Sequence, residues 1–161
     1  MQKKIQSIFI FISVVACIIF FRNIYVNYQF DSQPLGETYL REIDRVEVKI
    51  LDNMYQVYGF KARFPIVITD KIPGKIYGVT VLDQEGVITI YLNKKVMKES
   101  FDYVLSDVIA HEYAHALLFK KGHIAKEGHS ALWQQTCTKL GGANCQKYVD
   151  SHDVIMNKLP F

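Results

Sequence analysis

The sequence predicts an α+β domain that follows an apolar N-terminal helix. Three observations support this prediction: a charge-free apolar run near the N-terminus, helical periodicity over residues 37–58 and 101–121, and short β-branched runs between those two segments. Hydrophobic residues make up 50% of the chain and charged residues 22%, which excludes a disordered protein. The chain beyond the apolar run is long enough for one domain with a core and not comfortably long enough for two.

The N-terminal segment is predicted to be a membrane anchor. Residues 5–21 carry no charge, and a run of this length lies at the lower end of the about 17–25 residues that a membrane-spanning helix needs. Aromatic residues follow this run, where rings settle at a membrane interface. We therefore expect residues 1–30 to form an uncleaved single-pass anchor and residues 31–36 to form a linker.

Two other fates of this segment stay open. A cleaved signal peptide also has a short apolar core, but no clear Ala-x-Ala site follows this one. Val14–Cys17 resembles the lipobox of bacterial lipoproteins, in which Cys17 would be lipidated. Lipoproteins usually turn polar after this cysteine, whereas this chain stays apolar, so the uncleaved anchor is favoured.

The distribution of charge indicates how the anchor is oriented and argues against nucleic acid as a partner. Lys3, Lys4 and Arg22 are the charged residues of segment 1–30, and they account for the whole net charge of +3. Residues 31–161 are therefore formally neutral, which argues against a nucleic-acid-binding domain with clustered cations. Because two lysines precede the apolar run and one arginine follows it, the positive-inside rule favours an extracytoplasmic domain.

The first part of the domain is predicted to be a helix followed by a small three-stranded sheet. Over Glu37–Tyr58 apolar residues recur at steps of three and four, and Gly59 is expected to end the helix. Three β-branched runs then predict strands over Phe64–Thr69, Ile76–Leu82 and Val87–Leu92. Four residues ending in glycine separate the last two runs, which predicts a hairpin.

Two further helices are predicted after the sheet. Lys94–Ser100 is expected to be a polar connection of at most one helical turn. The next helix is predicted over Phe101–Lys121, with Gly122 as its stop. The last is predicted over Ser130–Leu140, where Gly141 supplies the left-handed residue that ends a helix.

The predicted helix 101–121 contains the sequence His-Glu-Tyr-Ala-His. His111 and His115 lie four residues apart, so both imidazoles project from one helix face and can bind one Zn²⁺ at about 2.0–2.1 Å. Glu112 lies on the neighbouring flank, where it can reach an attacking water without being a ligand. This pattern predicts metal-assisted hydrolysis with Glu112 as the general base.

A catalytic zinc site needs a third protein ligand and one open position. A metzincin would place that ligand at residue 121, which is a lysine here, and Glu127 lies in a loop where we expect it to be solvated. His129 opens the next predicted helix, which can pack across the first, so it is the favoured ligand. His123 and His152 remain as alternatives.

Residues 111–122, HEYAHALLFKKG, followed by GHSALW at 128–133, resemble the SprT-like (Spartan-type) zinc metalloproteases. Members of that family carry H-E-x-x-H on one helix and a third histidine at the start of the next, usually before a glycine; Ser130 stands there in this chain. The resemblance implies a minimal zincin-like peptidase domain over residues 37–161. Its catalytic residue would be Glu112 and its zinc ligands His111, His115 and His129.

The likeness extends through Leu140–Asn144 to a His-Asp pair. His152 and Asp153 either lie beside the metal, where they would orient a ligand or polarise a substrate carbonyl, or form an ordinary surface pair. Cys137 and Cys145 form a disulfide if the domain is exported, or remain two reduced thiols.

The expected function is that of a zinc metalloendopeptidase acting on proteins or peptides and held at the membrane by residues 5–21. One alternative is a non-catalytic zinc-containing module that binds a peptide at the membrane. Another is a cytoplasmic SprT-like protease acting on DNA-bound proteins. The resemblance does not extend to DNA repair, because the domain is neutral and the sequence to Phe161 shows no zinc ribbon.

Overall fold

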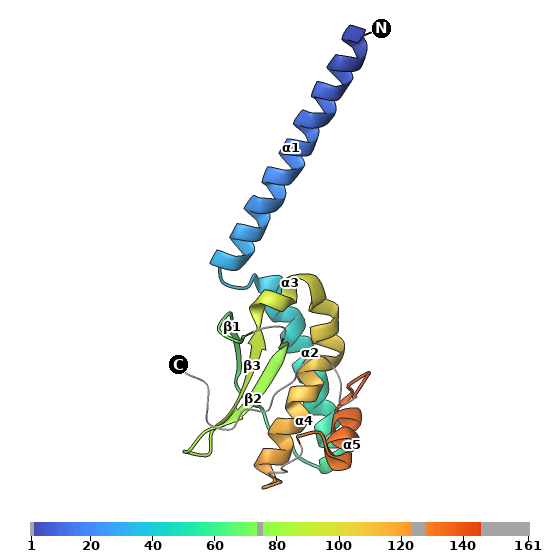
Figure 1. Ribbon diagram of the computed structural model, residues 1–161. Helices are drawn as coiled ribbons and strands as arrows, with labels where there is room; N and C mark the ends of the chain where they lie inside the picture. Colours follow the sequence, from blue (N-terminus) through green and yellow to red (C-terminus); the bar gives the residue numbers. More distant parts are fainter. Residues whose placement is uncertain (1, 74–75, 124–127, 146–161) are drawn as a thin grey trace. The chain divides into compact units, whose positions relative to one another are not determined.

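The computed structural model describes residues 2–73, 76–123 and 128–145 (Figure 1). The chain divides into two compact units, Met1–Leu35 and Gly36–Phe161, and each is described by itself. In chain order the elements are α1 (Gln2–Ser32), α2 (Glu37–Tyr58), β1 (Ile66–Thr69), β2 (Gly78–Leu82), β3 (Ile88–Asn93), α3 (Lys94–Tyr103), the π-helical segment η1 (Val104–Val108), α4 (Ile109–Lys120) and α5 (Ala131–Leu140). The predicted α+β class is confirmed.

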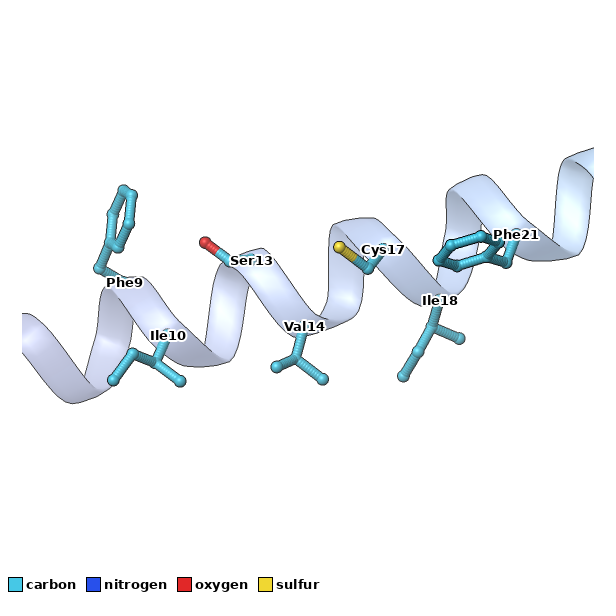
Figure 2. A pocket seen from close by; sticks show the side chains of 7 residues that line it. All are labelled: Phe9, Ile10, Ser13, Val14, Cys17, Ile18 and Phe21. Atoms are coloured by element: carbon cyan, nitrogen blue, oxygen red, sulfur yellow. The ribbon is translucent and has the colours of Figure 1, made fainter.

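The first unit is a single apolar helix, α1. Its 25-residue stretch Gln6–Phe30 contains an 18-residue window with a mean hydropathy of 2.3, and none of that window is buried. Figure 2 shows one face of this helix, where Ser13 and Cys17 lie among five large apolar side chains. The helix continues to Ser32, so the non-helical connection to α2 spans only residues 33–36. By length and composition α1 can cross a membrane, a criterion that a signal sequence also meets.

Helix α2 has the predicted bounds, because its signals are local in sequence. Its buried positions follow the helical period and are Ile43, Glu47, Ile50 and Met54. Gly59 adopts a left-handed conformation with φ of 76°, and its N–H donates to the Tyr55 carbonyl at 2.8 Å. This conformation is accessible to glycine at little cost, so the chain leaves the helix there.

The three predicted strands form one sheet in the order β1-β3-β2. Strands β2 and β3 pair antiparallel, with Thr80 opposite Ile90, so the predicted hairpin is confirmed. Strand β1 pairs in parallel with β3, with Ile66 opposite Ile90. Side chains of β3 at Ile90 and Leu92 are completely buried, which makes β3 the centre of the sheet and leaves β2 at one edge.

The two faces of β2 pack against different parts of the domain. Val79 belongs to a buried cluster with Ile72 and Ile76. Gly78 and Thr80 lie on the opposite face, because side chains alternate along a strand, and both contact α4. Strand β2 therefore connects the sheet directly to the helix that carries the His-Glu-Tyr-Ala-His sequence.

The prediction of a polar connection at Lys94–Ser100 is wrong, because this segment belongs to α3. Asn93 caps the helix by accepting a hydrogen bond from the Lys95 N–H at 3.0 Å, and Met97 is fully buried. The backbone breaks at Ser100, with φ of −135° and ψ of 29°. The predicted helix 101–121 is therefore divided among the end of α3, η1 and α4.

Helix α4 lies at the centre of the domain. It is buried from Ile109 to Leu118 and contacts β2, β3, α2 and α5. A helix buried on all sides needs partners for every polar side chain it carries. The buried polar residues of α4 are therefore candidates for a functional site.

Candidate metal centre

Three imidazoles converge at one point between α4 and the start of α5. The Nε2 atoms of His111 and His115 lie 3.3 Å apart, those of His115 and His129 3.4 Å, and those of His129 and His111 3.0 Å. The three ring centroids are 4.9–5.0 Å from one another. Among the described residues these histidines form a group whose ligand atoms all lie within 4.8 Å.

This donor set fits a zinc ion. Two nitrogens bound to a tetrahedral Zn²⁺ at about 2.0–2.1 Å lie about 3.3–3.4 Å apart, close to the three separations observed here. Three histidines with one open position are also the ligand set of a catalytic zinc site rather than of a closed structural one. The residues therefore fit a bound Zn²⁺, with His111, His115 and His129 as the groups that would hold it.

The beginning of α5 explains how His129 reaches the two histidines of α4. The hydroxyl of Ser130 accepts a hydrogen bond from the Trp133 N–H at 3.3 Å, so Ser130 is the N-cap and α5 begins at Ala131. His129 stands immediately before this cap. Serine in place of the glycine usual in SprT-like proteins thus gives the helix a defined start, which fixes the position of the preceding histidine.

Trp133 packs against all three imidazoles. Its ring centroid lies 4.5 Å from those of His111 and His129, and it stacks on His115 at 5.2 Å with an interplanar angle of 23°. The side chain is 1% exposed. The spacing of four residues from His129 was the signal in the sequence that could have indicated this contact. Trp133 restricts the imidazoles to their convergent orientation.

Glu112 is buried against strand β2. Its side chain is 1% exposed, and its Oε2 accepts a hydrogen bond from the Thr80 hydroxyl at 2.7 Å. A buried carboxylate beside histidines that could hold a metal ion has the chemistry to accept a proton from water during hydrolysis. Sequence reasoning did not identify Thr80, because no local pattern relates it to residue 112.

Tyr113 connects the same turn of α4 to α2. Its hydroxyl donates to Glu47, which also accepts hydrogen bonds from the Arg63 guanidinium, one of them at 2.9 Å from Nε. Burial, together with the hydrogen bond and negative charge of Glu47, raises the pKa of Tyr113 well above its ordinary value. The tyrosine therefore remains a neutral donor, and this network holds α4 against α2.

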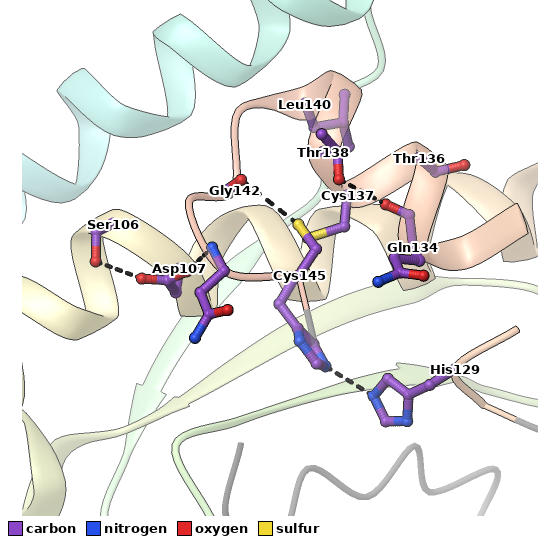
Figure 3. Close-up of a disulfide and its surroundings, with 12 residues drawn as sticks. Ser106, Asp107, His129, Gln134, Thr136, Cys137, Thr138, Leu140, Gly142 and Cys145 are labelled. Atoms are coloured by element: carbon purple, nitrogen blue, oxygen red, sulfur yellow. Dashed lines mark hydrogen bonds between the residues drawn. A yellow bond between two sulfur atoms is a disulfide. The ribbon is translucent and has the colours of Figure 1, made fainter. Parts of the chain in front are cut away.

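Asp107 ties the segment after α5 to η1. Its Oδ1 accepts the Asn144 N–H at 2.5 Å and its Oδ2 accepts the Ser106 hydroxyl at 2.6 Å. Figure 3 shows Asp107 near the disulfide between Cys137 and Cys145, whose Cα atoms are 5.9 Å apart. A Cβ at Gly142 would lie 2.6 and 2.7 Å from the two sulfurs, so the turn requires glycine.

Loss of this disulfide should lower the stability of the domain. The bond joins cysteines eight positions apart, and closing a loop of this size is worth about 2–3 kcal/mol. We expect the double substitution Cys137→Ala, Cys145→Ala to reduce the free energy of unfolding by about that amount. Urea unfolding can be followed through Trp133, the single tryptophan of the chain.

The control is Cys17→Ser, which changes the exposed free cysteine on α1. It should leave the unfolding of the domain unchanged. Equal stability of the parent and the double variant would contradict the expected contribution of the disulfide.

The remaining candidates from the sequence are placed as follows. His123 is exposed and lies outside the histidine group of the described residues. Glu127, His152 and Asp153 fall outside the described residues, so the alternatives stated for them stay predictions.

The comparison with known protein families agrees with the interpretation of these histidines as a candidate metal site. The sequence model of the SprT-like family matches residues 31–153, which is most of the chain. No curated protein and no solved structure is similar enough to count as a match. The match covers α2, the sheet, α4 and α5, and so includes every residue that builds the histidine group. This chain belongs to the SprT-like family.

Proposed function

We propose that this protein is a membrane-anchored zinc metalloendopeptidase with a zincin-like domain. The observation that carries the proposal is the convergence of three Nε2 atoms next to a buried glutamate of the same helix. Membership of the SprT-like family supports the same activity.

In this proposal the roles of the residues follow from their chemistry. A bound Zn²⁺ would polarise the scissile carbonyl and lower the pKa of a water in the open position. His111, His115 and His129 hold the metal, and Trp133 shields their rings from solvent. Glu112 accepts a proton from the attacking water as the new C–O bond forms, and it then returns the proton to the leaving amine as the C–N bond breaks.

The arrangement of the sheet favours an extended peptide as the substrate. In the described part of the chain, β2 has a neighbouring strand on one side only, and it is the strand that contacts Glu112. The backbone of an edge strand can pair with an extended segment of another chain. We therefore propose that unstructured or locally unfolded protein segments are cleaved, since these can lie alongside β2.

Chemical analysis of the products tests this function. The full-length chain should cut an unstructured protein at internal peptide bonds, and in H₂¹⁸O each new carboxyl terminus should gain ¹⁸O. A chelator should stop the reaction and added Zn²⁺ should restore it. Cleavage that continues at the same rate after the metal is removed would contradict the proposal.

We further propose that α1 anchors the protein with its domain outside the cytoplasm. The apolar, unburied stretch Gln6–Phe30 supports insertion, and a disulfide such as Cys137–Cys145 is typical of an oxidising compartment. A reporter that works only in the cytoplasm, fused after Phe161, should be inactive. An active reporter would contradict the orientation. Recovery from cells of a soluble domain from which α1 has been cleaved would contradict the anchor.

A further inference from the structure

The hydroxyl of Thr80 contacts Glu112 at two points. It donates to the carboxylate at Oε2, 2.7 Å away, and it lies 3.0 Å from the main-chain oxygen of the same residue. Thr80 is completely buried on β2. One hydroxyl of the sheet therefore lies within hydrogen-bond distance of both the carboxylate and the main-chain oxygen of Glu112.

Gly78 leaves space for the same side chain. A Cβ at this position would lie 3.0 Å from both Cγ and Oε1 of Glu112, and 3.1 Å from a methyl of Val108. Contacts this short require the neighbour to move. The absence of a side chain at residue 78 therefore allows Glu112 to lie directly against the strand.

The register of the sheet places both residues on the face that meets α4. Residues 78 and 80 are separated by one position, so they share a face of β2. Pairing of Thr80 with Ile90 in the hairpin holds this register. A slip of one residue would bring Val79 or Val81 against Glu112 in place of the hydroxyl and the open space.

We infer that Thr80 is a positioning residue for Glu112, and that Gly78 provides the space in which the positioned side chain lies. The effect on catalysis rests on the proposed peptidase function. A glutamate side chain has several rotamers, and small misplacements of a catalytic group are costly to the rate. The hydrogen bond at Oε2 selects one of these rotamers before substrate arrives.

The test compares Thr80→Val with Thr80→Ser in the full-length chain. Valine keeps the shape of threonine and removes the hydroxyl, whereas serine keeps the hydroxyl and removes the methyl group. In T80V we expect kcat for an unstructured protein to fall about 10- to 100-fold, with KM and zinc affinity unchanged. T80S should recover most of the rate.

A second readout does not depend on activity. In metal-free, isotope-labelled protein, the three-bond couplings that report χ1 of Glu112 should show one rotamer in the parent and in T80S, and averaging in T80V. Because this measurement requires no cleavage, it separates failure of the positioning role from failure of the peptidase function. A single Glu112 rotamer in T80V would overturn the inference, as would equal loss of rate in T80S and T80V.

Discussion

Replacement of Glu112 by glutamine should reduce the rate of peptide cleavage by about 10²–10⁴-fold while zinc stays bound. Glutamine has nearly the same volume as glutamate, and its carbonyl oxygen can still accept the Thr80 hydrogen bond, so the packing against β2 should persist. What it cannot do is take up the proton of the attacking water. Cleavage of an unstructured protein and the zinc content of the same samples should be measured together.

Glu85→Gln provides the matched control. Glu85 is an exposed residue of the β2–β3 hairpin, and its substitution removes the same charge without touching the site. This variant should cleave at the rate of the parent. Cleavage by zinc-loaded E112Q at the parent rate would show that Glu112 is not the general base.

The second large effect is expected for His129→Ala, which should weaken zinc binding by more than about 100-fold and abolish cleavage. Loss of a hydrogen-bond partner behind a metal ligand already costs about 10–100-fold in affinity, and loss of the ligand itself should cost more. Zinc binding can be followed by competition with a chromophoric chelator. It can also be followed through Trp133, because this ring contacts all three imidazoles.

His123→Ala is the control for His129→Ala. His123 is exposed, and its backbone N–H donates to the Leu118 carbonyl at 2.9 Å, a hydrogen bond that survives the substitution. The zinc affinity of the H123A variant should equal that of the parent protein. If H123A loses zinc and H129A keeps it, the assignment of the third ligand is wrong.

The parts of this fold that could be predicted are those with local signals. Helix α2 was predicted to the residue because periodicity and a terminal glycine both lie within its own segment. The histidine pair of α4 was predicted because the helical repeat alone places residues four apart on one face. His129 required more, namely that α5 packs across α4; its place at the start of the next predicted helix favoured it, and the resemblance to a known family supported the same assignment.

The parts that could not be predicted depend on packing between distant segments. Helix α3 was missed because its sequence is mostly polar; only the Asn93 cap and buried Met97 indicated it. The π-helical segment η1 changes the helical period just before α4, and no residue pattern in the sequence predicts such a change. Thr80 meets Glu112 only through the sheet order and register, which the separate strand signals do not determine.

The central claim is that one metal ion, held by three histidines, makes this protein a peptidase. The most direct measurement is a titration of Zn²⁺ into the metal-free full-length chain, with bound zinc and cleavage of an unstructured protein recorded on the same samples. Both quantities should rise together and saturate at one zinc per chain. One tightly bound zinc with no cleavage would instead identify a non-catalytic zinc module, and full cleavage without bound zinc would contradict the metal-dependent mechanism.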